Sequence, residues 1–134
     1  MKKLGILTLC LLSPFAQANT ESEIKSVVEE NFRATQAEDL NATLKTIHSQ
    51  SASFAPSQNA LNQIFSTYDL KYSLLEFKFI AEEGGYAYAR VKQLTEKITG
   101  PAFSNNELES LQIFKKENGS WKLWTQANLA VNFK

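Results

Sequence analysis

The sequence predicts an α+β domain in which three N-terminal helices cover one face of a four-stranded antiparallel sheet. Apolar residues recur at helical spacing as far as Asp69, and from residue 71 onward they alternate at period two. The pair Asn118-Gly119 suits a two-residue hairpin turn, because both residue types tolerate positive φ. Helices that precede the strands, rather than alternating with them, are typical of the α+β class.

Three helices are expected before the sheet. The first covers about 21–37, because the capping box Thr20-Glu21-Ser22-Glu23 precedes apolar residues at helical spacing. The second follows Asp39, which is a suitable N-cap residue. The third covers 59–69, and the polar segment 49–57 before it is expected to be a loop with Phe54 as its apolar anchor.

The four strands are separated by glycine-containing turns. These turns are Glu83-Gly84-Gly85, Gly100-Pro101 and Asn118-Gly119. The strands are therefore expected over 71–82, 86–99, 107–117 and 120–132.

The first hairpin admits two registers. A two-residue loop, Gly84-Gly85, places Arg90 and Lys92 opposite Phe79 and Phe77, where the two cations would serve as anion ligands. A loop one residue longer, starting at residue 83, avoids packing charge against phenylalanine, and we prefer it. Its cross-strand pairs are Phe79–Ala89, Phe77–Val91, Glu76–Lys92 and Leu74–Leu94.

The Asn118-Gly119 turn sets the register of the last hairpin. The predicted pairs are Phe114–Leu123, Gln112–Thr125 and Ser110–Ala127 on one face, and Ile113–Trp124 and Leu111–Gln126 on the other. This register separates the two tryptophans, since Trp121 joins the helix-covered side and Trp124 the outer side.

Residues 1–18 have the pattern of a bacterial secretory signal peptide. Lys2 and Lys3 precede an apolar segment, 4–12, and Ala16-Gln17-Ala18 is a small-x-small cleavage pattern. The apolar segment is too short to cross a bilayer as a helix. We therefore expect cleavage after Ala18, export to the periplasm or the medium, no membrane contact after cleavage, and a single domain over 19–134.

The mature chain excludes several classes of function. It has no cysteine and one histidine, His48, so neither a disulfide nor a metal site is expected. Its glycines lie at predicted turns rather than in a phosphate-binding loop, and no cofactor is expected. Without Lys2 and Lys3, the 14 basic residues of the chain fall to 12, against 14 acidic residues. With no basic patch, nucleic acid is not an expected partner.

Two segments carry a resemblance to a known family. One holds Ala37-Glu38-Asp39-Leu40, Ile47-His48 and Ala52-Ser53-Phe54, and the other is the hairpin 114–123 that ends in Gly119-Ser120-Trp121-Lys122-Leu123. With the order of elements, they resemble the nuclear transport factor 2-like superfamily, a cystatin-like cone fold that includes ketosteroid isomerase and polyketide cyclase relatives. The resemblance covers nearly all of 19–134. It implies a strongly bent sheet, a cavity between helices and sheet, and frequently a homodimer through the outer sheet face.

The isomerase-like members of that superfamily carry an acidic general base just before a proline. Here the corresponding residue is Ala55, before Pro56, and an alanine cannot accept a proton. Asp39 and Asp69 sit at predicted helix ends, where capping or solvation explains them. His48 is interpreted as the polar end of the second helix rather than as a general base.

We therefore expect a non-catalytic domain that binds a small apolar ligand or a protein partner in its cone cavity. Aromatic and neutral polar side chains of the inner face would line that cavity. The predicted ligand-binding residues are Phe54, Tyr68, Phe77, Gln93, Gln112, Trp121 and Thr125. The alternative is a small lyase- or isomerase-type enzyme that uses His48, Tyr68 or Glu76 as a non-standard acid–base set.

The outer sheet face is expected to form a homodimer interface. An antiparallel sheet normally exposes one face to water, but Leu74, Leu94, Ile113 and Trp124 are expected there. This much apolar surface indicates a partner, and a second copy packed sheet to sheet is the simplest one.

Overall fold

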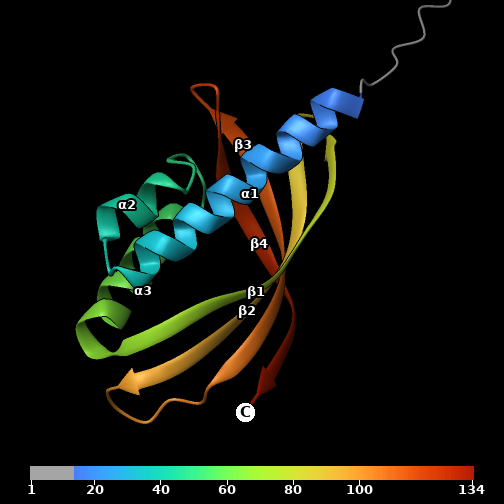
Figure 1. The fold of residues 1–134 in the computed structure, drawn as a ribbon. Helices are drawn as coiled ribbons and strands as arrows, with labels where there is room; N and C mark the ends of the chain where they lie inside the picture. Colours follow the sequence, from blue (N-terminus) through green and yellow to red (C-terminus); the bar gives the residue numbers. More distant parts are fainter. Residues whose placement is uncertain (1–13) are drawn as a thin grey trace, which may run out of the picture.

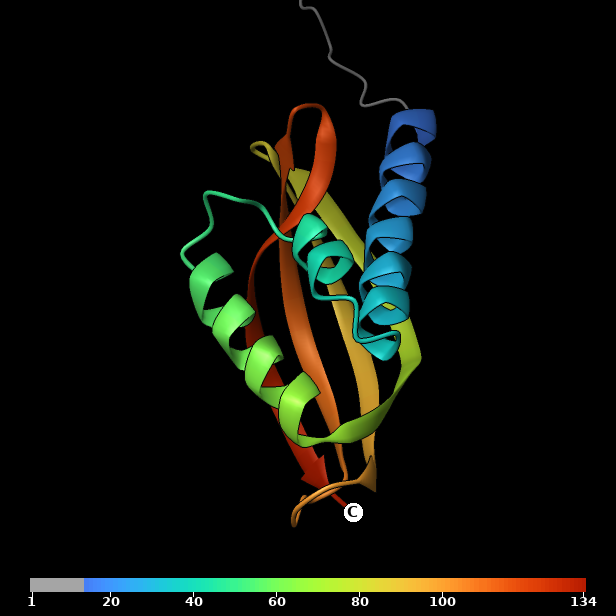
Figure 2. The same ribbon diagram turned by 90° about the vertical axis from the view of Figure 1, so that its left-hand side faces the viewer.

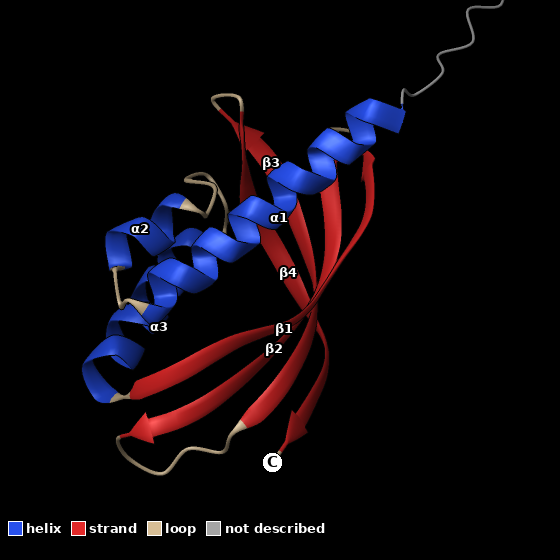
Figure 3. Cartoon of the chain, viewed as in Figure 1, coloured by secondary structure: helices blue, strands red, loops and turns tan. Residues whose placement is uncertain are grey.

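A computed structural model describes residues 14–134 of the chain. Three helices are followed by four strands, which confirms the predicted α+β class (Figures 1 and 3). The elements are α1 (Pro14–Gln36), α2 (Leu40–Lys45), α3 (Phe54–Thr67), β1 (Asp69–Glu83), β2 (Tyr86–Thr99), β3 (Asn106–Glu117) and β4 (Ser120–Phe133).

The strands form one antiparallel sheet in the order β1-β2-β3-β4. The sheet is strongly bent, and all three helices lie on its concave side, with α2 between α1 and α3 (Figures 1 and 2). The convex side carries no helix (Figure 1). Among residues 14–134, no helix has the length and apolar character needed to cross a membrane.

The first helix begins earlier than the sequence predicted. α1 already includes Pro14, so Thr20 lies within it rather than at its N-cap. The Thr20 hydroxyl donates to the carbonyl of Ala16 (3.0 Å) and to Glu82 of β1 (2.6 Å), so the predicted capping box is not formed in the full chain. Most of the predicted leader, 1–13, lies outside the described residues.

The Asp39 cap is confirmed, because its Oδ1 accepts from the backbone N–H of Ala42 (2.9 Å). α3, in contrast, begins at Phe54, within the segment predicted as a loop. Pro56 does not interrupt this helix, since a proline in the first turn removes an N–H that has no intrahelical partner.

The chain between α2 and α3 pairs with the edge of the sheet. Ile47 forms a parallel bridge with Leu123 of β4. The N–H of His48 donates to the carbonyl of Leu123 (2.9 Å), and the N–H of Leu123 donates to the carbonyl of Thr46 (2.8 Å). These bonds satisfy the outer edge of β4 near its start and fix α2 over the sheet.

The first hairpin combines parts of both predicted registers. Glu83 pairs with Tyr86, so the loop is the two-residue Gly84-Gly85 rather than the three-residue loop we preferred. A bulge at Ile80 then shifts the register by one residue and restores the expected pairing of the phenylalanines. A second bulge, at Leu75, alters the predicted Leu74–Leu94 pair. The resulting pairs are Phe79–Ala89, Phe77–Val91, Glu76–Lys92, Leu74–Gln93 and Ser73–Leu94.

The last hairpin follows its prediction only near the turn. Phe114 pairs with Leu123 as expected, but a bulge at Trp124 shifts the strand by one residue beyond that point. Thr125 therefore pairs with Ile113 on the convex side, and the predicted inner-face position of Thr125 is wrong. The observed pairs after the bulge are Ile113–Thr125, Gln112–Gln126, Leu111–Ala127 and Ser110–Asn128.

Bulges account for most of the exposed large apolar side chains. Leu75, Ile80, Ile98 and Leu129 each stand at a register shift of the sheet, and each is about half exposed. A bulge residue is left out of the ladder, so it does not follow the inner and outer alternation of its strand. The exposed apolar residues are thus distributed over three strands.

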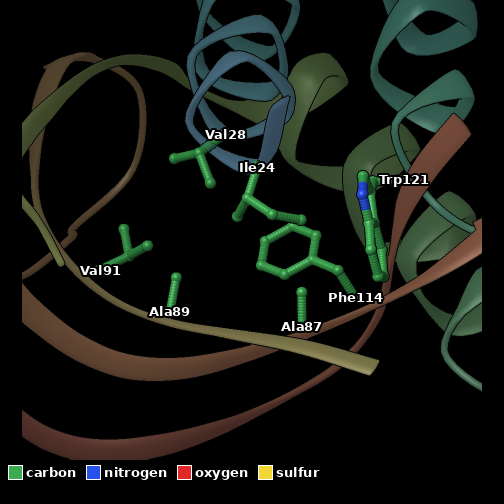
Figure 4. Close-up of a cluster of buried hydrophobic side chains, with 7 residues drawn as sticks. All are labelled: Ile24, Val28, Ala87, Ala89, Val91, Phe114 and Trp121. Atoms are coloured by element: carbon green, nitrogen blue, oxygen red, sulfur yellow. The ribbon is translucent and has the colours of Figure 1, made fainter. Parts of the chain in front are cut away.

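The core lies between α1, the first half of β2, the end of β3 and the start of β4 (Figure 4). Phe114 (1% exposed) contacts this cluster from β3, while the small side chains of Ala87 and Ala89 let α1 approach β2 closely. The buried residues of the cluster are Ile24, Val28, Ala87, Ala89, Val91, Phe114 and Trp121. Burial of this kind is the main stabilising contribution to a domain without disulfides.

Candidate functional site

A cavity of about 260 Å³, open to solvent, lies between the three helices and the sheet. α3 contributes no buried residue, so it stands over the sheet as a wall rather than packing onto it. The apolar lining consists of Phe32, Ile47, Ala60, Leu61, Ile64 and Leu123. The polar lining consists of Asn31, Thr35, Thr43, Ser57, Tyr72 and Gln93. None of these twelve side chains carries a charge at neutral pH.

Hydrogen bonds hold the polar wall of this cavity in place. Asn31 of α1 donates to the hydroxyl of Thr46 (2.7 Å), which in turn donates to the carbonyl of Thr43 (2.6 Å). Gln93 of β2 donates to the hydroxyl of Thr95 (3.3 Å). The side-chain oxygens of Asn31 and Gln93 have no hydrogen-bond donor among residues 16–134, and they are the acceptors that the wall offers.

Tyr72 supplies a neutral donor on the β1 side of the cavity. Burial raises the pKa of its phenol, and the nearby carboxylate of Glu38 raises the pKa further. The group therefore stays protonated throughout the physiological range and carries an O–H that can donate. The backbone of Tyr72 is fixed separately, since its N–H donates to Oε1 of Gln36 (2.8 Å).

Of the seven predicted ligand-binding residues, Gln93 lines this cavity. Phe54 is the first residue of α3 and is half-buried away from the lining, and Phe77 packs against the core from β1. Tyr68 ends α3, where its ring packs edge-on against Phe103 (centroids 5.6 Å apart). The predicted aromatic wall therefore does not form as a unit.

The other three predicted residues lie in three different places. Gln112 is buried below the cavity and donates weakly to Gln126 (3.5 Å). Trp121 belongs to the core, and its indole N–H has no hydrogen-bond partner among residues 16–134. A buried donor left without a partner costs about 1–3 kcal/mol. Thr125 lies on the convex side because of the bulge at Trp124.

His48 is held in a structural role at the edge of β4. It is 4% exposed, and its ring packs edge-on against Trp124 (centroids 4.9 Å apart). Its Nδ1 accepts from the N–H of Gln50 (3.1 Å), so in the neutral ring the proton lies on Nε2. Oε2 of Glu117 is 3.6 Å from the same nitrogen. This distance describes an ion pair only when the ring is protonated.

The three residues of the alternative acid–base set do not converge. His48 lies at the edge of β4 and Tyr68 at the junction of α3 and β1, where its hydroxyl reaches the carbonyl of Ala102 (3.4 Å). Glu76 lies across the sheet, 3.7 Å from Lys92 on the convex side. A reacting atom could not be within hydrogen-bond distance of all three.

Sequence reasoning missed the helix residues of the cavity. Asn31 and Thr35 lie on the same stripe of α1 as Ile24 and Val28, where helical spacing would place apolar core residues. A polar residue that interrupts an apolar stripe is the signal that could have identified them. Of the α3 residues, Ser57 falls in the segment predicted as a loop, whereas Ala60, Leu61 and Ile64 fall in the predicted helix, where no polar residue interrupts the apolar stripe.

The four residues predicted for the dimer interface do not share one face. Leu94 and Ile113 lie on the convex side, where Ile113 is flanked by Tyr88 and Thr125. Leu74 pairs with Gln93 and packs against the core on the concave side, which corrects its predicted position. Trp124 packs against His48 at the edge of β4.

Solved structures of similar fold include several proteins without an established function. A putative aromatic ring hydroxylase from Novosphingobium aromaticivorans is 13% identical, with a TM-score of 0.69 over 87% of this chain and 94% of that chain. A protein of unknown function with a cystatin-like fold from Nostoc punctiforme is 13% identical, with a TM-score of 0.68 over 86% and 92%. A ketosteroid isomerase-like protein from Erwinia carotovora atroseptica is 16% identical, with a TM-score of 0.58 over 81% and 95%.

At these identities the structural likeness shows the fold alone, and that fold is the nuclear transport factor 2-like fold expected from the sequence. No curated protein matches the chain by sequence. The model of one protein family, described as the C-terminal domain of anti-sigma-I factor RsgI9, matches residues 26–134. The chain therefore belongs to the family of the anti-sigma-I factor RsgI9 C-terminal domain, and it has a nuclear transport factor 2-like fold.

Proposed function

We propose that this domain is a non-catalytic binding module that holds a small, neutral, largely apolar ligand in the cavity between α3 and the sheet. One observation carries the proposal: a cavity of about 260 Å³ is lined by twelve side chains, and none of them is charged. Ligand sites are typically apolar recesses with a few polar groups that fix orientation.

The polar groups of the wall define the ligand further. The phenol of Tyr72 is a donor, while the side-chain oxygens of Asn31 and Gln93 are acceptors. A ligand with one or two neutral polar groups on an apolar frame would satisfy them. A charged ligand would lose its hydration without gaining a counter-ion, which is costly in an apolar recess.

The distribution of titratable groups favours binding over catalysis. The raised pKa of Tyr72 keeps its phenol neutral, and no carboxylate, histidine or lysine lines the cavity beside it. General acid–base catalysis needs a group that exchanges a proton near the working pH, within hydrogen-bond distance of the substrate. The family description also names a domain of a regulatory protein rather than an enzyme.

A neutral fluorescent probe tests the cavity directly. We expect 1-aminoanthracene to bind with a saturable rise in fluorescence and a dissociation constant of about 1–100 μM. Ala60 lines the cavity from α3, so Ala60→Trp should fill the recess and weaken binding by about tenfold or more.

The matched control places the same side chain elsewhere on α3. Ala55 is exposed and does not line the cavity, so Ala55→Trp should leave the affinity unchanged. Thermal melting of both variants shows that the fold is kept. A wild-type protein without saturable binding, or equal affinities in the two variants, would overturn the proposal.

We further propose that the domain acts after export. The support is the leader pattern of residues 1–18, with its small-x-small motif before Asn19. Expression in a Gram-negative host, followed by fractionation and mass spectrometry, tests this. The expected result is a periplasmic chain beginning at Asn19, and an unprocessed chain in the cytoplasm would contradict it.

Homodimerisation through the convex face is part of the same proposal. That face has no helix over it, and Leu94 and Ile113 lie on it. Four of its charges form two ion pairs, since Arg90 bonds Glu109 and Lys92 lies 3.7 Å from Glu76, and this pairing reduces the repulsion between two copies. Sedimentation should show a dimer for the wild type and a monomer for Ile113→Glu. A monomeric wild type would reject the interface.

A further inference from the structure

A second recess lies on the other side of α2 from the cavity. It has a volume of about 630 Å³ and runs between α1, the end of α2 and the β3–β4 hairpin. The Asn31–Thr46 hydrogen bond joins α1 to the end of α2 at the boundary, because Asn31 lines the cavity and Thr46 lines the recess. We call this second recess the α1–α2 groove.

The floor of the groove contains a buried donor with nothing to bond. Trp121 is 4% exposed, and its Nε1 is the one buried side-chain polar atom without a hydrogen-bond partner among residues 16–134. Trp121 also lines the groove. Figure 4 shows the nitrogen at the end of the ring nearer the helices, away from the apolar cluster. Because the nitrogen itself is buried, an acceptor would reach it from the groove only after side chains of the rim move aside.

The two walls of the groove carry opposite charges. The α1 wall presents Glu23, whose carboxylate accepts only from the neutral side chain of Asn19 (3.2 Å). The opposite wall presents Lys45, and its ammonium forms no ion pair among residues 16–134. Glu23 and Lys45 do not pair with each other across the groove.

The other two charged residues of the walls form contacts within the chain. Glu30 on the α1 wall accepts twice from the guanidinium of Arg33 (2.6 and 2.8 Å). Lys122 on the opposite wall donates to the carbonyl of Lys45 (2.5 Å) but forms no ion pair among residues 16–134. The groove thus offers the carboxylate of Glu23 on one wall and the ammonium groups of Lys45 and Lys122 on the other, with an N–H in the floor between them.

We propose that the α1–α2 groove binds a small zwitterion, namely a short peptide with free α-ammonium and α-carboxylate groups. Its ammonium would pair with Glu23, and its carboxylate would pair with Lys45 and accept from the indole N–H of Trp121. Apolar side chains of the peptide would lie against Val27 and the indole ring. Because the nitrogen lies below the groove surface, the long side chains of the rim move aside as the peptide enters. This site is separate from the neutral cavity proposed above.

Two-dimensional ¹H–¹⁵N NMR of the labelled protein tests the site through the indole signals. The chain has two tryptophans, and Trp124→Phe identifies the Trp121 signal. The probes are the dipeptides Ala-Leu, Leu-Leu and Leu-Phe, each titrated to about 10 mM. We expect at least one of them to shift the Trp121 indole signal downfield with saturation, at a dissociation constant below about 1 mM.

Charge deletion in the ligand and in the protein should have matching effects. N-acetylated and C-amidated forms of the bound dipeptide should bind about tenfold more weakly, because each lacks one charge-assisted hydrogen bond. Glu23→Gln and Lys45→Met should weaken binding of the parent dipeptide by a similar factor. Both residues are exposed, so the variants should fold normally.

The exposed pair Lys25 and Glu29, on another face of α1, supplies the controls. Lys25→Met and Glu29→Gln should bind like the wild type. The proposal fails if no dipeptide moves the Trp121 signal, or if the blocked dipeptides bind as well as the parent. Competition with 1-aminoanthracene separates the two sites. If the dipeptide displaces that probe, binding is in the neutral cavity and the groove assignment is wrong.

Discussion

The side-chain amide of Gln36 forms, with the backbone around Tyr72 at the open edge of β1, the hydrogen bonds that a neighbouring strand would otherwise form. Oε1 of Gln36 accepts from the N–H of Tyr72 (2.8 Å), while its Nε2 donates to the carbonyl of Leu70 (3.1 Å). One residue near the end of α1 thereby satisfies two backbone groups of an edge strand and fixes Tyr72 beside the cavity.

Removing this amide should loosen the start of β1. Gln36→Ala should lower the free energy of unfolding by about 1–2 kcal/mol, since two hydrogen bonds of about 0.5–1.5 kcal/mol each are replaced by bonds to water. Urea denaturation followed by circular dichroism measures the change. Gln58→Ala, on the exposed surface of α3, is the control and should differ from the wild type by less than about 0.5 kcal/mol. Equal values for both variants would contradict the role of Gln36.

Gly100 should tolerate substitution less well than the hairpin glycine Gly84. Gly100 has φ of +126°, and a Cβ there would lie 2.8 Å from Cδ1 of Tyr68 and 3.0 Å from the carbonyl oxygen of Thr67. Gly84 has φ of +60° and nothing within 4 Å of a Cβ. Gly84→Ala should cost about 1–2 kcal/mol from its left-handed backbone. Gly100→Ala should cost more, because a steric clash adds to the strain. Equal melting temperatures would refute the close approach of Tyr68.

Glu117 should make stability depend on pH in the acidic range. Hydrogen bonds from the Ser49 side chain lower the pKa of Glu117 from its ordinary value of 4.5, and the Ser49 N–H, His48 and Lys122 act in the same direction. A lowered folded pKa means that the stabilisation is present above the unfolded pKa and is lost as the pH falls through the folded pKa. The wild type should therefore exceed Glu117→Gln in stability at pH 7, and the difference should shrink toward pH 3.

Unfolding titrations at several pH values measure this difference. Glu83→Gln is the control, because the Glu83 side chain forms no hydrogen bond among residues 16–134 and should show no comparable narrowing. A gap between the wild type and Glu117→Gln that stays constant from pH 7 to pH 3 would exclude the Ser49 contact as its source.

Phe114 should be the most sensitive single position of the core. It is 1% exposed and packs between α1 and β2, so Phe114→Ala should lower the free energy of unfolding by about 3–5 kcal/mol through lost burial and the cavity left behind. Ile98→Ala, at a bulge residue that is 55% exposed, should change it by less than about 0.5 kcal/mol. Chemical denaturation gives both values, and a small effect at Phe114 would place the core elsewhere.

The strand limits could be predicted from the sequence because their signals are local. Alternation at period two and the glycine turns predicted both ends of β2 correctly, and they predicted the ends of β3 to within one residue. The bulges could not be predicted, since the alternation within a strand does not mark which residue is left out of the ladder. Each bulge reverses the inner and outer assignment of the residues up to the next one, and for that reason the bulge at Trp124 moved Thr125 to the convex side.

The sequence predicted a cavity between the helices and the sheet, but most of the residues predicted to line it lie elsewhere. Gln93 was found because a polar residue on an inner strand face is conspicuous. Tyr72 was missed because the start of β1 alternates less clearly. Ser57 was missed because Pro56 suggests a loop when it is read without the helix that follows it, which also placed the start of α3 too late. A proline has opposite meanings in the first turn of a helix and in its interior, and only the helix boundary distinguishes them.

The bulges also bear on the solubility of the chain. Both edge strands carry two of them, at Leu75 and Ile80 in β1 and at Trp124 and Leu129 in β4, whereas β3 carries none. An uninterrupted apolar edge is a template for intermolecular strand pairing and for fibril growth. Each bulge breaks the run of evenly spaced backbone groups that such growth needs. The same irregularities that bend the sheet around the cavity therefore also protect the open edges against aggregation.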